Sequence, residues 1–253
     1  MKLSFTYSVC CIALATVSSF TLAFVPSTPL TSTRSLHISP ASTTHRLAAS
    51  NNWFINVLSK PSASKKTFAA VAAEVAALKQ DLYAVAKNKD NGLKASEADK
   101  AQILALASEL IKLNPTKRIA TSNKVDGTWR LVYTSTTGGS AGKLGPFVGE
   151  VLQKIDTASG DYVNFVRLFG GLVEGALVAT WEVKGANEWK VIFQNITFRL
   201  FGLPVVDKKP LNGQAGQWKL TYLDEDLRIV TAAGLTNEGK PAKVVNIYVL
   251  RRV

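Results

Sequence analysis

The sequence predicts a mainly β protein with N-terminal helices, an α+β chain in which a helical hairpin precedes an antiparallel β-barrel of about eight strands. Apolar residues follow helical spacing between Thr67 and Asn114, and after Asp126 they alternate in short runs separated by turn residues. The chain has 253 residues, of which 47% are hydrophobic. This length allows one fair-sized domain with extra segments, but not two large domains.

The helical hairpin is expected within residues 50–115. Its first helix covers Thr67–Lys87, where apolar residues recur every three or four positions on an alanine-rich background. A second helix begins after Ser96, with Asp99 as a capping-box partner, and ends at Asn114-Pro115. We interpret the apolar stripes of both helices as packing surface. A helix lying on a membrane surface is the alternative.

Residues 116–253 are predicted to form the barrel. The expected strands are Thr128–Thr134, Val148–Ile155, Tyr162–Leu168, Ala176–Val183, Trp189–Phe198, Gln217–Leu223, Leu227–Ala232 and Val244–Arg251. Consecutive hairpins of this kind close into an up-and-down barrel, and closure removes exposed sheet edges. An eight-stranded barrel can be filled by side chains or can hold one small ligand.

Aromatic residues on these strands are the candidates for lining the barrel and binding a ligand: Trp129, Tyr133, Phe165, Trp181, Phe193, Trp218, Tyr222 and Tyr248. An aromatic lining suits an apolar ligand, because such pockets are built mainly from hydrophobic and aromatic side chains. The alternative is that these residues only fill the core, since aromatic residues favour strands in any case.

The first 49 residues have the composition of two successive targeting segments. Residues 1–23 hold a basic residue, a short apolar run and small residues before Ala23, which is typical of a secretory signal peptide. A transmembrane anchor is the alternative, but Ser and Thr interrupt the apolar run. Residues 24–49 are rich in Ser and Thr, contain Arg and lack acids, which is typical of a transit peptide rather than a disordered secreted segment.

A signal peptide followed directly by a transit peptide resembles the bipartite presequence of algae whose plastids have extra membranes, with Phe24 in the position after cleavage. The resemblance implies a plastid protein, in the stroma or at the thylakoid, whose mature chain begins near residues 47–60. Loss of residues 1–49 removes three positive charges and no negative one, so the net charge falls from +12 to about +9. The remaining basic residues occur as scattered pairs, and we expect no nucleic-acid partner.

The placement of histidine and cysteine excludes several kinds of site. His37, His45, Cys10 and Cys11 are the only such residues, and all of them lie in the predicted targeting segments. The mature chain would therefore have no Ser-His-Asp triad, no cysteine nucleophile, no disulfide and no zinc site of the Cys/His type. We expect no catalytic residue, no metal and no cofactor. An enzyme that uses carboxylates and tyrosine, such as an isomerase, remains the third hypothesis.

Two polar segments are interpreted as connections. The segment TTGGSAGKL at 136–144 lacks the spacing of a phosphate-binding loop and is expected to be a flexible loop near the barrel mouth. The segment TYLDEDLRIV at 221–230 places Asp224 and Asp226 in a tight turn, with Arg228 close enough to pair with either acid. We favour a hairpin corner. A polar anchor for a ligand headgroup and a catalytic carboxylate pair are the alternatives.

Three motifs, in order, resemble the plastid lipid-associated proteins, also called fibrillins. They are DGTWRLVYTS at 126–135, VGEVLQKID at 148–156 and YLDEDLRI at 222–229. The resemblance covers residues 67–252. It implies a lipocalin-like barrel, association with plastoglobules and thylakoids, and binding of lipids, carotenoids or quinones.

A shorter motif, Gly127-x-Trp129, is similar to the opening of lipocalins, in which an arginine near the last strand covers the tryptophan. Arg251 and Arg252 are the candidates for that arginine here.

The sequence therefore predicts a protein that binds a small hydrophobic molecule in the plastid without catalysis, at the thylakoid or plastoglobule. The alternative is a structural coat protein of plastid lipid globules, with a filled barrel and the helical hairpin as the docking surface. The sequence identifies neither the ligand nor a protein partner.

Overall fold

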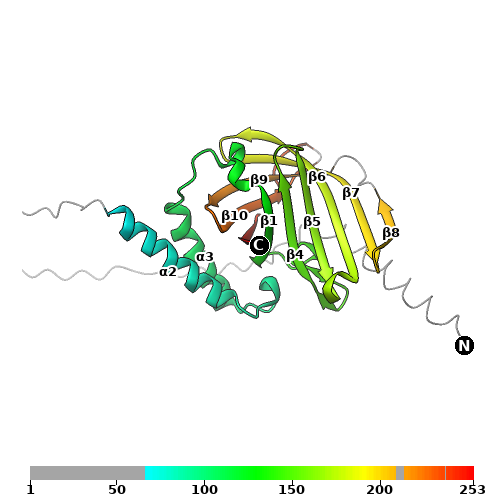
Figure 1. The fold of residues 1–253 in the computed structure, drawn as a ribbon, viewed down its shortest axis with the longest axis horizontal. Helices are drawn as coiled ribbons and strands as arrows, with labels where there is room; N and C mark the ends of the chain where they lie inside the picture. Colours follow the sequence, from blue (N-terminus) through cyan, green and yellow to red (C-terminus); the bar gives the residue numbers. More distant parts are fainter. Residues whose placement is uncertain (1–65, 209–213, 237) are drawn as a thin grey trace, which may run out of the picture.

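The computed structural model describes residues 66–208, 214–236 and 238–253, so the predicted targeting segments lie outside the described residues. Two helices precede a closed, antiparallel eight-stranded β-barrel (Figure 1). This arrangement confirms the predicted fold class. Neither the length nor the hydropathy of any helix in the described residues is that of a membrane span.

The barrel closes through β7, which pairs with both β6 and β9. Around the barrel the order is β1, β4, β5, β6, β7, β9, β10, β11 and back to β1, with every pair antiparallel. The bounds are β1 Gly127–Thr134, β4 Glu150–Asp156, β5 Asp161–Leu168, β6 Val173–Gly185, β7 Glu188–Leu200, β9 Ala215–Leu223, β10 Leu227–Gly234 and β11 Asn246–Arg252. Each predicted strand overlaps one of these eight.

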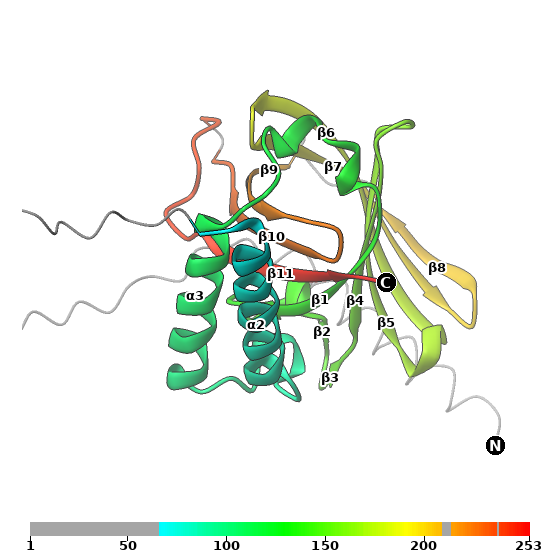
Figure 2. The ribbon, with the colours of Figure 1, turned by 60° about the vertical axis from the view of Figure 1, so that its left-hand side comes forward.

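The structure has short strands that the sequence did not predict. β8 (Leu203–Lys208) pairs with the second half of β7, beyond the segment that pairs with β9, and it lies on the far side of the barrel from the helices (Figure 2). Pro204 lies within β8, and proline argues against a strand because it cannot donate to the ladder. β2 (Lys143–Leu144) and β3 (Phe147–Val148) form a separate two-stranded ladder.

The helical hairpin consists of α2 (Phe68–Ala86) and α3 (Glu97–Lys112), close to the predicted ranges. The predicted capping box is present, because Ser96 and Asp99 each accept a hydrogen bond from the other's backbone amide. The connection contains Gly92, whose φ of +106° favours glycine. A Cβ atom there would also clash with the carbonyl oxygen of Thr134, so the hairpin turn can approach β1 only with glycine at this position.

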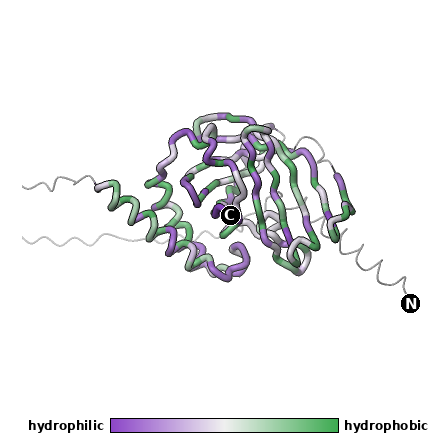
Figure 3. The backbone as a smooth tube through the Cα atoms, in the orientation of Figure 1, coloured by the Kyte–Doolittle hydropathy of each residue, from purple (hydrophilic) through white to green (hydrophobic). Residues whose placement is uncertain are grey.

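Hydrophobic and hydrophilic residues alternate along the strands (Figure 3), and the buried ones form two separate cores. The first core fills the barrel. The second lies between the hairpin and the outer face of the barrel, where Leu82, Ile103 and Leu110 of the helices pack with Ile229 and Val249 of the strands. Both faces of this part of the barrel are therefore buried.

Two β-bulges decide which aromatic residues face the helices. The pairing of β1 with β11 shifts by one residue between Leu131 and Tyr133. The pairing of β9 with β10 shifts in the same way, with the extra residue on β9, opposite Ile229 and Val230. A bulge adds one residue and shifts the alternation of faces beyond it. Tyr133 and Tyr222 consequently belong to the outer core under the hairpin, whereas Trp129 on β1 and Trp218 on β9 face the interior.

One end of the interior is organised around Trp129, which is completely buried. The indole Nε1 donates to the carbonyl of Val125 at 2.8 Å, and the guanidinium of Arg252 lies over the ring, 4.2 Å from its centroid. Arg252 also donates to the carbonyls of Lys124 and Glu225, each at 2.6 Å, and to that of Asp126. Of the two candidate arginines, Arg252 is therefore the one that covers the tryptophan.

The acidic stretch forms the β9–β10 turn, as predicted. The Asp224 carboxylate accepts from the backbone amides of Asp226 at 3.1 Å and Leu227 at 2.9 Å, and from the Tyr222 hydroxyl. The predicted ion pair between Arg228 and these acids is wrong, because Arg228 points into the barrel. Lys79 of α2 occupies the position instead, with its Nζ 2.6 Å from Asp224 and also paired with Asp226.

These contacts shift the pKa of both partners. Burial alone would raise the pKa of Asp224, but hydrogen bonds from Lys79, Tyr222 and the backbone hold it below its ordinary value. Burial lowers the pKa of Lys79, but the hydrogen bonds and charges of Asp224 and Asp226 outweigh this effect and raise it. The pair is ionised at neutral pH and fixes α2 to the barrel.

Replacing Arg252 by Ala is expected to reduce the free energy of unfolding by about 2 kcal/mol, because three carbonyls lose a donor and Trp129 loses its cover. Arg251→Ala is the matched control, since this neighbouring arginine is exposed, and it should change stability by less than about 0.5 kcal/mol. Urea denaturation of both variants checks the difference. Equal losses would contradict the assigned role of Arg252.

Asp224→Asn is expected to reduce the free energy of unfolding by about 2 kcal/mol, because the Asp224 side chain is only 14% exposed and its loss leaves Lys79 without one of its partners. The exposed Glu225→Gln is the control, with a change below about 0.5 kcal/mol. The lowered pKa of Asp224 means that its stabilisation is complete above the unfolded-state value of about 3.9. The difference between the native chain and Asp224→Asn should therefore shrink as pH falls below that value, and a gap independent of pH would contradict the assignment.

Candidate functional site

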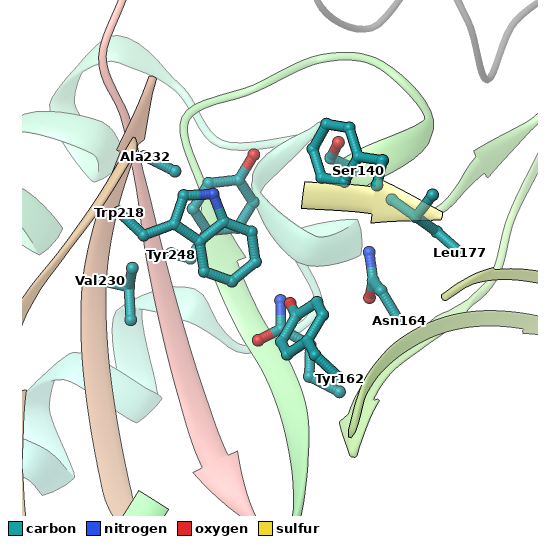
Figure 4. A pocket seen from close by; sticks show the side chains of 10 residues that line it. Ser140, Tyr162, Asn164, Leu177, Trp218, Val230, Ala232 and Tyr248 are labelled. Atoms are coloured by element: carbon teal, nitrogen blue, oxygen red, sulfur yellow. The ribbon is translucent and has the colours of Figure 1, made fainter. Parts of the chain in front are cut away.

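A hollow inside the barrel is the candidate functional site (Figure 4). Residues from β4, β5, β6, β7, β9, β10, β11 and the loop after β1 line it: Ser140, Gln153, Tyr162, Asn164, Leu177, Phe193, Trp218, Val230, Ala232 and Tyr248. The cavity volume is about 30 Å³, within a wider atom-free space of about 450 Å³ that includes solvent at its mouth. The site is therefore narrow.

Three of the eight predicted aromatic residues line this hollow: Phe193, Trp218 and Tyr248. Trp129 and Trp181 belong to or pack against the interior core without lining the hollow, and Trp181 stacks on Trp189 at 4.8 Å between ring centroids.

The other three aromatic candidates lie on the outer face. Tyr133 and Tyr222 are under the helices, as described above. Phe165 alternates with the inward-facing Asn164 and Val166 and carries the guanidinium of Arg167, 5.1 Å from its ring centroid.

Other lining residues were not predicted as site residues. Tyr162 is buried in the interior and meets Trp218 edge to face, with ring centroids 4.9 Å apart. It shares its face of β5 with Asn164, Val166 and Leu168, so strand alternation could have identified it. The glycine-rich segment contributes Ser140 through the 3₁₀ turn Gly139–Ala141. The segment was expected to be a flexible loop near the barrel mouth, and the structure places its Ser140 in the lining of the hollow.

Arg228 is the main electrostatic feature of the interior. It lies on β10 with its side chain completely buried, and its Nη2 donates to Gln153 Oε1. The guanidinium carbon is 5.2 Å from the centroid of the Trp129 ring. Among the described residues, no carboxylate forms an ion pair with Arg228, and its Nε and Nη1 have no hydrogen-bond partner. Burial lowers the pKa of Arg228 to about 10, so the side chain is still a cation at neutral pH.

Arg228 does not line the hollow itself but adjoins it through Gln153. Polar atoms of the lining are also without a partner in the described part of the chain. They are the hydroxyl of Tyr162, the indole Nε1 of Trp218 and the Oδ1 of Asn164. Tyr248 differs because it forms hydrogen bonds with Ser140 and Thr134. Burial raises the pKa of Tyr248, and these hydrogen bonds reduce the increase. Figure 4 shows these side chains directed towards the same space from different strands.

Comparison with known proteins identifies the family. The family model PAP_fibrillin matches residues 76–234, from within α2 to the end of β10. The chain belongs to this family. The predicted resemblance to plastid lipid-associated proteins, or fibrillins, is confirmed at this level.

A curated relative gives a second comparison. Probable plastid-lipid-associated protein 5, chloroplastic, of Arabidopsis thaliana is 28% identical over 158 residues, which cover 62% of this chain. The match spans 65% of the relative's own length. In this fibrillin-family chain, the matched family segment holds most of the barrel and all residues of the hollow except Tyr248 on β11.

Proposed function

We propose that this fibrillin-family protein binds a small hydrophobic molecule, such as a lipid, carotenoid or quinone, in the plastid and without catalysis. The supporting observation is the hollow inside the closed barrel, with mainly apolar and aromatic walls and a few polar atoms lacking protein partners. Ligand sites typically combine such walls with a small number of polar groups that orient the ligand. The chloroplastic relative and the composition of residues 1–49 support the plastid location.

The dimensions of the hollow favour a slender ligand. Because little of the space admits even a water-sized sphere, an acyl or prenyl chain would fit with smaller side-chain movements than a wide ring system. Each buried methylene group of such a chain contributes about 0.8 kcal/mol, so partial enclosure of the chain is enough for useful affinity. The proposed mechanism is burial of apolar surface.

Filling the hollow is expected to abolish binding. Ala232→Phe adds a ring to the lining, whereas Ala158→Phe makes the same change on the exposed β4–β5 turn. We expect mass spectrometry of organic extracts from the proteins purified from plastids to find one hydrophobic molecule per chain with the native sequence and with Ala158→Phe. Ala232→Phe should carry less than about a tenth as much. Equal loading of all three proteins would contradict binding in the hollow.

A coat protein of lipid globules is the second candidate function, and an exposed apolar patch supports it. This loop patch consists of residues that are 46% to 71% exposed: Phe147, Phe169, Leu172, Phe201, Leu203 and Val205. The β5–β6 and β7–β8 turns meet in it, where the Phe201 amide donates to the Leu172 carbonyl at 2.7 Å. The rings of Phe147 and Phe169 lie edge to face at 5.3 Å.

The loop patch suits a lipid surface for two reasons. Exposed aromatic and aliphatic side chains gathered at loop ends can enter the acyl boundary of a lipid layer. Arg167 and Arg199 lie on the same strand ends and share the single carboxylate of Glu174, at 2.7 Å and 3.8 Å, which leaves an excess of positive charge. This patch, rather than the helical hairpin, is the proposed contact with a thylakoid or plastoglobule surface, because the hairpin buries its apolar side against the barrel.

Removing the aromatic residues of the loop patch should weaken lipid binding. We expect the double variant Phe169→Ser, Phe201→Ser to bind vesicles of neutral lipid with a minor anionic component at least about tenfold more weakly than the native chain. The control is Phe68→Ser at the start of α2, a phenylalanine of the hairpin that is more exposed than either Phe169 or Phe201. Vesicle flotation measures both. A loss confined to Phe68→Ser would favour docking through the hairpin and contradict the role of the loop patch.

A further inference from the structure

Arg228 is placed where a cation needs a partner that the barrel does not provide. Its side chain is completely buried, and its contacts are one amide oxygen, from Gln153, and the face of Trp129. Removing a charge from water is costly unless the charge is paired and hydrogen-bonded. The titratable neighbours of Arg228 are Tyr162, which stays uncharged at neutral pH because burial raises its pKa, and Arg252, whose charge is repulsive. The interior of the described barrel therefore carries net positive charge.

The polar atoms around Arg228 show the same imbalance. Nε and Nη1 of Arg228, the Tyr162 hydroxyl and Trp218 Nε1 can all donate, and none has an acceptor among the described residues. Asn164 Oδ1 is a buried acceptor of the hollow without a donor, and the Tyr162 hydroxyl can accept as well as donate, but neither group carries negative charge. A ligand that complements this site must bring oxygen acceptors and negative charge.

We propose that the hollow binds the carboxylate of a long-chain acid, with Arg228 as the counter-charge. This inference rests on the proposed binding of a hydrophobic molecule and specifies its chemical class. Gln153 and Tyr162 both line the hollow and both adjoin Arg228, so they mark the place where the carboxylate meets the guanidinium. Leu177, Phe193 and Val230 supply apolar surface for the first part of the chain.

The chemistry favours a carboxylate over a neutral headgroup. A carboxylate presents two oxygens to a guanidinium in a bidentate arrangement, and a bond between two ionised partners is about twice as strong as a neutral one. The small free volume also selects against a bulky phosphorylated headgroup. Gln153 acts as a positioning residue, because its amide oxygen holds one end of the guanidinium and leaves the other nitrogens free for the ligand.

The test compares an acid with its own ester on the unaltered protein. Fluorescence titration with cis-parinaric acid and with its methyl ester changes the charge of the headgroup while the chain is kept. We expect the acid to bind at least about tenfold more tightly than the ester. Equal affinities would overturn the inference but leave the binding of a hydrophobic molecule in place. Binding of neither probe would overturn both proposals.

Variants then test whether Arg228 is the charge that gives the preference for the acid. Arg228→Met should abolish the preference for the acid over the ester, and Arg228→Lys should retain part of the preference. Arg251→Met removes an exposed arginine and should leave the preference intact. Without ligand, Arg228→Met should melt no lower than the native chain, since replacing an unpaired buried charge by an apolar side chain is often stabilising. A lower melting temperature together with an unchanged preference for the acid would assign Arg228 a structural role and overturn the inference.

Discussion

Closure of the barrel is the constraint on which the rest of the structure depends. Because β7 pairs with β6 on one side and β9 on the other, eight strands satisfy one another's backbone groups and separate an interior from water. A polar side chain inside must then find a partner within the barrel or in a ligand. Tyr248 finds such partners in Ser140 and Thr134, whereas Arg228 has the single oxygen of Gln153. The same closure that creates the hollow makes an unpaired cation beside it chemically significant.

The second core determines which residues the interior can use. The helical hairpin covers the outer face of β1, β9, β10 and β11 and is held there by apolar packing and by the contact of Lys79 with the β9–β10 turn. Two bulges send Tyr133 and Tyr222 to this outer core. The acidic turn is therefore part of the attachment between hairpin and barrel. The interior is left with Arg228 as its charged group beside the hollow.

The sequence predicted the parts of the molecule that depend on local patterns. Strand alternation gave the eight barrel strands, and Ser96 with Asp99 gave the start of α3. The facing of Tyr133 and Tyr222 could not be predicted, because one inserted residue in a strand reverses the alternation and leaves no clear pattern in the sequence. The ion-pair partner of Asp224 could not be predicted either. Lys79 is far from Asp224 in the sequence, whereas Arg228, the predicted partner, is close to Asp224 in the sequence. Within β10, alternation puts Arg228 on the face of Val230 and opposite Leu227 and Ile229, but because both faces are apolar and buried, the pattern did not show which face is the interior.

We propose that the interior of the barrel is a ligand site organised by the charge of Arg228. A crystal structure of the protein with a bound long-chain acid is the decisive measurement. We expect electron density for the carboxylate within hydrogen-bond distance of the Arg228 guanidinium, with the chain running past Phe193 towards the mouth of the hollow. Density for the acid between the hairpin and the barrel or on the loop patch, with only water beside Arg228, would contradict it.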